Sequence, residues 1–116
     1  MGDITWIKLK TDMFENEKIR EIESQPSGDT VLVIWFKLIG LSHRANAKGF
    51  IVLEKDIPLN IEEISTLIKR PINIVRYSIS VLCRLQMVEM DRNELIHIVN
   101  WESYLIPDCK KVKGIG

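Results

Sequence analysis

The stretch from Asn60 to Leu85 constrains the fold most, because it holds two short helical patterns separated by a proline. Asn60 can accept backbone hydrogen bonds at a helix start, and Glu63, three residues later, completes a capping box. Pro71 cannot continue that helix, but its fixed backbone angle suits the first position of a new one. The sequence therefore predicts two helices joined by a turn of about three or four residues. We expect Arg70 to be the N-cap of the second helix and Pro71 its first residue.

Each of the two helical patterns has an apolar face with helical spacing. In the first helix, we expect the inward residues to be Ile61, Ile64, Leu67 and Ile68. We also expect Leu59 to pack on Ile64 as a hydrophobic staple. In the second helix, we expect the inward residues to be Ile72, Val75, Ile79, Leu82 and Leu85.

The opposite face of the second helix is basic and rich in hydrogen-bonding groups. It carries Asn73, Arg76, Tyr77, Ser80 and Arg84. Such a face fits the major groove of duplex DNA, where asparagine can pair with adenine and arginine with guanine or phosphate. We expect these residues, together with Lys69 and Arg70 in the turn, to contact DNA. The alternative interpretation is an ordinary solvated helix face.

The charge distribution supports the DNA interpretation more than the net charge does. The net charge of the 116-residue chain is zero, which by itself counts against a phosphate-binding protein. However, residues 1–63 hold 8 basic and 11 acidic side chains, whereas residues 64–116 hold 8 basic and 5 acidic ones. Between Ser65 and Gln86 there are four basic residues and no acidic one. The positive field therefore lies on the second helix.

Two short extended runs follow this helix, at residues 87–90 and 95–98. The polar residues 91–94 separate them, so the pattern predicts a hairpin. Arg92 lies in the turn of this hairpin. We consider it either a phosphate contact or an ordinary turn residue.

The N-terminal half predicts a strand at residues 4–10, a short charged helix at 15–24, a buried apolar helix at 31–41 and a second strand at 50–53. Gly40 in the apolar helix favours close packing of a neighbouring element. The second strand can pair with the hairpin. We therefore expect an α+β, mainly helical fold, a winged helix-turn-helix with an added N-terminal strand and short helix.

The length of the chain suits a single core. We expect residues 1–104 to form a winged-helix DNA-binding domain with an N-terminal extension, and residues 105–116 to form a short, basic, flexible tail. The lysines of this tail are either a basic arm on the phosphate backbone or part of a frayed terminus. They are Lys110, Lys111 and Lys113.

The N-terminal strand has no hairpin partner in the sequence, and an unpaired strand edge is a template for another chain. We therefore expect self-association through Trp6, Ile7 and Leu9. The three tryptophans, Trp6, Trp35 and Trp101, could form a stacking platform for single-stranded DNA. Because they lie in apolar segments, we expect core packing or a dimer contact instead.

The sequence has no pattern typical of an enzyme or a metal site. His43 and His97 have no carboxylate or nucleophile at catalytic spacing, and the chain has no glycine-rich phosphate loop. Cys83 and Cys109 have no histidine at ligand spacing, so neither a zinc site nor a disulfide framework is indicated. We expect no enzymatic activity, no cofactor, no metal and no small-molecule substrate.

The sequence also gives no sign of export or membrane insertion. The N-terminal residues show no basic segment followed by an apolar run, as a secretory signal requires. The longest apolar run, residues 31–36, is far too short to span a bilayer. We expect a cytoplasmic protein without a membrane partner.

Several segments resemble the N-terminal region of phage replisome organiser proteins, which is similar to the N-terminal winged-helix domain of DnaD-type replication-initiation proteins. They are residues 4–14, Gly28-Asp29-Thr30 with Ile34-Trp35, Arg70-Pro71 and Asn100-Trp101-Glu102. The resemblance covers about residues 3–102. It implies a DNA-binding domain from a phage or prophage replication module, whose organiser binds double-stranded origin DNA and helps to recruit the host helicase machinery.

Family members generally continue into a further region, whereas this sequence stops soon after its last lysines. We therefore expect a truncated or stand-alone form, and host helicase-loading proteins as partners only of a longer one. Two alternatives stay open, because fold does not fix function. One is a winged-helix protein-interaction or oligomerisation module without specific DNA binding, which the near-zero net charge favours. The other is a phage-encoded transcriptional regulator.

Overall fold

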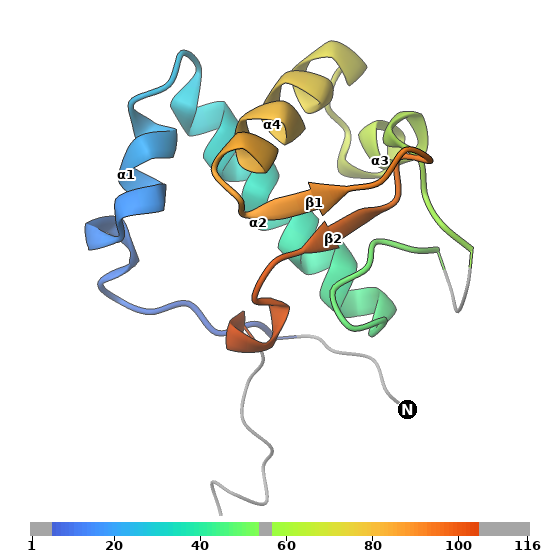
Figure 1. Ribbon diagram of the computed structural model, residues 1–116, viewed down its shortest axis with the longest axis horizontal. Helices are drawn as coiled ribbons and strands as arrows, with labels where there is room; N and C mark the ends of the chain where they lie inside the picture. The colour runs from blue at the N-terminus through green and yellow to red at the C-terminus, as the bar shows by residue number, and fades with distance from the viewer. Residues whose placement is uncertain (1–5, 54–56, 105–116) are drawn as a thin grey trace, which may run out of the picture.

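The computed structural model of the 116-residue chain describes residues 6–53 and 57–104. In chain order, the elements are η1 (Met13–Glu15), α1 (Glu17–Glu23), α2 (Gly28–Ala45), α3 (Ile61–Ile68), α4 (Ile72–Arg84), β1 (Val88–Met90), β2 (Ile96–Ile98) and η2 (Trp101–Tyr104). The described part is an α+β structure, mainly helical, with one two-stranded antiparallel sheet (Figure 1). It contains no helix that is long and apolar enough to cross a membrane.

Helix α2 is the centre of the fold, as its apolar sequence predicts. It packs against α1, α4 and β2, and Figure 1 shows it running behind α4 and the hairpin. Ile34, Trp35 and Leu38 are almost completely removed from solvent. The helix is longer at both ends than the predicted range, residues 31–41, and it ends where Asn46 adopts a left-handed conformation.

The two glycines of α2 differ from the prediction. We expected close packing at Gly40, but a Cβ atom added there would meet no described atom within 4 Å, so that prediction is wrong. The close approach occurs at Gly28, in the first turn of α2. A Cβ atom there would clash with the carbonyl oxygen of Ile22 and would lie 2.9 Å from that of Glu23. The missing side chain therefore allows α2 to start directly against the end of α1.

The strand predicted at residues 4–10 is not formed in its described part, which starts at Trp6. Ile7 makes a single β-bridge and packs against the core, whereas the exposed fractions of Trp6 and Leu9 are 74% and 42%. The prediction is wrong because an alternating pattern forms a strand only where a partner strand is available. The open side of the hairpin is taken by residues 49–51, through backbone hydrogen bonds to β2.

Helix α1 begins at Glu17 and not at Glu15, because a better cap follows the predicted start. The side-chain oxygen of Asn16 accepts hydrogen bonds from the backbone N–H groups of Lys18 at 2.8 Å and Ile19 at 3.3 Å. These bonds satisfy two of the donors that a helix start leaves unpaired. The preceding residues form the separate turn η1.

The predicted hairpin is confirmed, with Val88 opposite Ile98 in the β1–β2 ladder. The strand predicted at residues 50–53 is shorter than expected. Phe50 forms an antiparallel bridge with His97 of β2, and two backbone hydrogen bonds flank this bridge. The segment between α2 and α3 therefore pairs with the hairpin, as predicted, but only over about one bridge length.

Candidate nucleic-acid interface

Local signals define the start of α3 and the turn between α3 and α4. Glu63 N–H donates to the Asn60 side chain at 2.8 Å, and Asn60 N–H donates to the Glu63 carboxylate at 2.9 Å, so the predicted capping box is confirmed. Lys69 ends α3 in a left-handed conformation, with φ of 60°. The connection to α4 consists of residues 69–71, within the predicted length. The sequence therefore determines the geometry of this turn locally.

The start of α4 differs from the prediction by one residue. Pro71 is the N-cap, with φ of −60° and ψ of 143°, and its carbonyl oxygen accepts the N–H groups of Ile74 and Val75. Arg70 is therefore not the N-cap, and its own N–H closes α3 by donating to Ser65 O at 3.1 Å. The fixed φ of proline is compatible with either position. The extended ψ of Pro71 places it outside the helix.

Most of the predicted inward residues of the two helices are buried. These are Ile61, Ile64 and Ile68 in α3 and Val75, Ile79 and Leu82 in α4, with Leu59 buried before α3. Leu85 is only partly buried. Leu67 and Ile72 were also predicted to face inward, and this is wrong, because their exposed fractions are 49% and 38%. Both flank the α3–α4 turn, where the apolar face of each short helix runs past the edge of the core.

The side chains in the C-terminal part of the outward face of α4 are held by the α1–α2 turn. The Tyr77 hydroxyl donates to Pro26 O at 2.7 Å, and Arg84 Nη2 donates to Gln25 Oε1 at 3.0 Å. The Ser80 hydroxyl donates to the backbone oxygen of Tyr77 at 2.7 Å. This part of the face is therefore connected to the N-terminal helices of the fold.

The N-terminal part of the same face is open. Asn73 is exposed, and within residues 6–53 and 57–104 its side chain makes no hydrogen bond. Lys69 is exposed beside it in the turn, and Arg70 Nη1 donates only to Lys69 O, at 3.1 Å. Arg92 in the hairpin turn is exposed and has no ion pair among the described residues. Three cations and an amide are thus available for a ligand.

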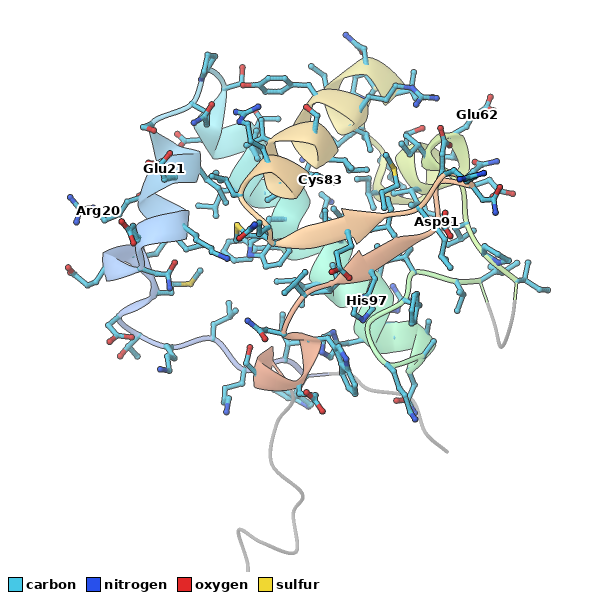
Figure 2. All side chains as sticks on the ribbon, viewed as in Figure 1. Arg20, Glu21, Glu62, Cys83, Asp91 and His97 are labelled. Carbon is cyan, nitrogen blue, oxygen red and sulfur yellow. The ribbon has the colours of Figure 1, made fainter. Side chains whose placement is uncertain are left out.

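Glu94 connects the hairpin turn to α3 and α4, and it is not among the residues predicted for the site. Arg76 Nη1 is 3.3 Å from Glu94 Oε2, and the other carboxylate oxygen accepts the N–H of Ile61 at 3.4 Å. In Figure 2, the label Asp91 marks this turn, which lies beside α3. The sequence offers one signal for this contact. Glu94 is a carboxylate in the predicted hairpin turn, and the charged residues of α4 are both arginines.

The two histidines are held by contacts within the fold. His43 is buried, with its two ring nitrogens 3.0 Å from the backbone oxygens of Ile39 and Trp101. His97 Nδ1 is 3.1 Å from Glu89 Oε1. Burial raises the pKa of the Cys83 thiol. Among the described residues, no group of histidine, cysteine and carboxylate side chains could hold a metal ion.

The tryptophans have three different environments. Trp35 is in the core, as expected, and Trp101 is half-buried against the core. Trp6 is exposed, so the expectation of core packing is wrong for this residue, and a dimer contact stays a prediction.

Cys109 and the three C-terminal lysines lie outside the described residues.

The comparison with protein families gives one finding. A sequence profile described as N-terminal phage replisome organiser matches residues 6–113. The match includes every helix and strand described above. Neither a curated protein nor a solved structure matches the chain significantly.

Proposed function

The chain belongs to the N-terminal phage replisome organiser family, and from this premise we propose that it is a winged helix-turn-helix domain that binds double-stranded DNA. The family resemblance inferred from the sequence is confirmed, and it connects the chain with phage replication. The DNA at a phage replication origin is therefore the duplex that we propose as its partner. We propose a binding role without enzymatic activity.

One observation carries this proposal: the open start of α4 beside the hairpin turn. Asn73 is exposed there, Lys69 and Arg70 lie in the turn before it, and Arg92 is exposed in the hairpin turn. The four cations between residues 65 and 86 have no acidic neighbour in that sequence range. α4 has 13 residues, so it is about 20 Å long, and the major groove is wide enough for one helix of this kind.

The proposed contacts divide by chemistry. Asn73 suits base edges, because its amide can donate and accept hydrogen bonds. Ser80 stays a weaker candidate, because its hydroxyl already donates to Tyr77 O. The cations suit phosphates, which position a protein on the duplex without reading its sequence. These cations are Lys69, Arg70, Arg76 and Arg92. Tyr77 and Arg84 stay candidate contacts at the border of the surface, because the α1–α2 turn already holds their polar atoms.

The test is a titration of the protein with a labelled duplex at several salt concentrations. Phosphate binding predicts that the logarithm of the affinity falls linearly with the logarithm of the salt concentration. Arg92→Gln should weaken binding to every duplex and flatten the slope by about one unit. Arg20→Gln is the matched control, since Arg20 is an exposed arginine on α1, away from α4 (Figure 2). A wild-type protein that binds no duplex, or the same loss in both variants, would contradict the proposal.

A second candidate function, self-association, rests on the exposed apolar side chains of the N-terminal segment. Trp6 is 74% exposed and Leu9 42%, whereas Ile7 next to them packs against the core. We propose that a second copy of the chain covers Trp6 and Leu9. The Trp6→Ser variant should then have a lower mean mass than the wild type in light scattering at equal concentration. Phe14→Ser is the control, because Phe14 is also half-exposed, and equal masses for all three proteins would contradict self-association.

A further inference from the structure

The turn of the β1–β2 hairpin fixes the position of Glu94. One oxygen of the Asp91 carboxylate accepts the N–H groups of Asn93 at 2.8 Å and Leu95 at 3.0 Å. Glu94 N–H donates to Asp91 O at 3.0 Å, and Glu94 itself has φ of 66°. The turn is thus closed by its own hydrogen bonds, so the backbone determines where the Glu94 side chain starts.

From this position, the Glu94 carboxylate contacts both helices of the proposed DNA-binding surface. One oxygen accepts the N–H of Ile61, the first residue of α3, at 3.4 Å. A negative charge is favoured there by the helix dipole. The other oxygen lies 3.3 Å from Arg76 Nη1 of α4. Glu94 therefore holds the hairpin turn, α3 and a cation of α4 together.

We propose that Glu94 is a positioning residue that holds Arg76 in place in the free protein. When DNA binds, the Arg76 guanidinium exchanges the Glu94 carboxylate for a DNA phosphate. The inference rests on the proposed DNA-binding function and deepens it. Arg76 lies one helical turn after Asn73 on the same face of α4, so a duplex on this face brings phosphates to the same guanidinium. The exposed fractions of the Arg76 and Glu94 side chains are 53% and 35%, and ion pairs exposed to this degree are weak enough to be exchanged.

This exchange has a functional consequence. Every duplex competes with the Glu94 carboxylate for Arg76, whatever the base sequence. The affinity for all duplexes is thereby lowered by a similar factor. Base contacts from the start of α4, such as those of Asn73, then decide which duplexes stay bound, because only base contacts depend on sequence.

The variant Glu94→Gln tests the exchange. The amide oxygen can still accept the N–H of Ile61, but the charge that holds Arg76 is removed. Glu62→Gln is the matched control, because Glu62 is an exposed glutamate in the first turn of α3 and its side chain makes no hydrogen bond among the described residues. At low salt, Glu94→Gln should bind any duplex about threefold to fivefold more tightly than the wild type. Glu62→Gln should change the affinity much less.

Repeating the measurement in an Arg76→Gln background separates exchange from simple repulsion between Glu94 and DNA. If Glu94 acts through Arg76, the gain from Glu94→Gln disappears in this background. Three results would overturn the exchange: a gain that persists in this background, equal gains in the two glutamate variants, or a loss of affinity in Glu94→Gln. Salt-dependent binding by the wild type would still support the proposed function. A wild type that binds no duplex would overturn both.

Discussion

The two ends of the outward face of α4 have the same pattern in the sequence but different neighbours in the structure. At the C-terminal end, Tyr77 and Arg84 bind the α1–α2 turn. At the N-terminal end, the Asn73 side chain makes no hydrogen bond among the described residues, and Arg76 pairs with the hairpin turn through Glu94. A single helical face therefore combines a part that orients the helix with a part that is open to a ligand.

The difference teaches that a position on a helical wheel does not determine the role of a polar side chain. All these residues share one face, and the sequence predicts the same DNA-binding role for each of them. The tertiary contacts separate them, because the bonds to Pro26 O and Gln25 Oε1 hold the Tyr77 hydroxyl and the Arg84 guanidinium against the α1–α2 turn. The following predictions test this separation.

The largest effect is expected at the α1–α2 turn that holds the C-terminal end of the face. Gly28→Ala forces a Cβ atom against the backbone of α1, so we expect it to lower the free energy of unfolding by about 1–3 kcal/mol. Gly40→Ala in the same helix is the control, since its Cβ atom would meet no described atom and should stabilise the helix by up to about 1 kcal/mol. Denaturant melts measure both values. Equal changes in the two variants would show that the turn is not closely packed.

A smaller effect is expected for the hydroxyl of Tyr77. Tyr77→Phe removes the hydrogen bond to Pro26 O, which should lower the free energy of unfolding by about 0.5–1.5 kcal/mol. Because the hydroxyl is assigned to the α1–α2 turn, the affinity for duplex DNA should stay within about twofold of the wild-type value. Unchanged stability together with a clear loss of DNA affinity would place Tyr77 in the open part of the face.

The smallest effect is expected at Pro71, where two variants test the position of the helix start. At an N-cap, the serine hydroxyl can accept a hydrogen bond from a backbone N–H group, whereas the alanine side chain cannot. Pro71→Ser should therefore be more stable than Pro71→Ala by about 1 kcal/mol. Pro71→Ala itself should cost at most about 1 kcal/mol relative to the wild type. Equal stabilities of the two variants in thermal melts would instead favour the helix start predicted from the sequence.

The features that the sequence predicts correctly are local. The capping box of Asn60 and Glu63 and the hairpin turn depend on residues within a few positions of each other. The buried residues of α3 and α4 follow from helical spacing. The family follows from short motifs spread along the sequence, from residues 4–14 to Asn100-Trp101-Glu102. All of these signals are independent of how distant segments pack.

The features that the sequence does not predict depend on distant partners. The N-terminal alternation forms only a single bridge in its described part, because an alternating pattern does not by itself supply a partner strand. Leu67 and Ile72 have inward spacing, but the core does not extend to the α3–α4 turn. The roles of Glu94 and of the α1–α2 turn arise from contacts between residues 18 to 59 positions apart. A single sequence contains no direct signal for such contacts.

The most direct test of the central claim, that the start of α4 and not its end faces DNA, is the salt dependence of duplex binding for two arginine variants. Arg76→Gln and Arg84→Gln each remove one cation from the same helical face. If the account is right, Arg76→Gln flattens the slope of log affinity against log salt by about one unit, and Arg84→Gln flattens it by less than about half a unit. A slope that changes as much for Arg84→Gln as for Arg76→Gln, or that changes for neither, would contradict it.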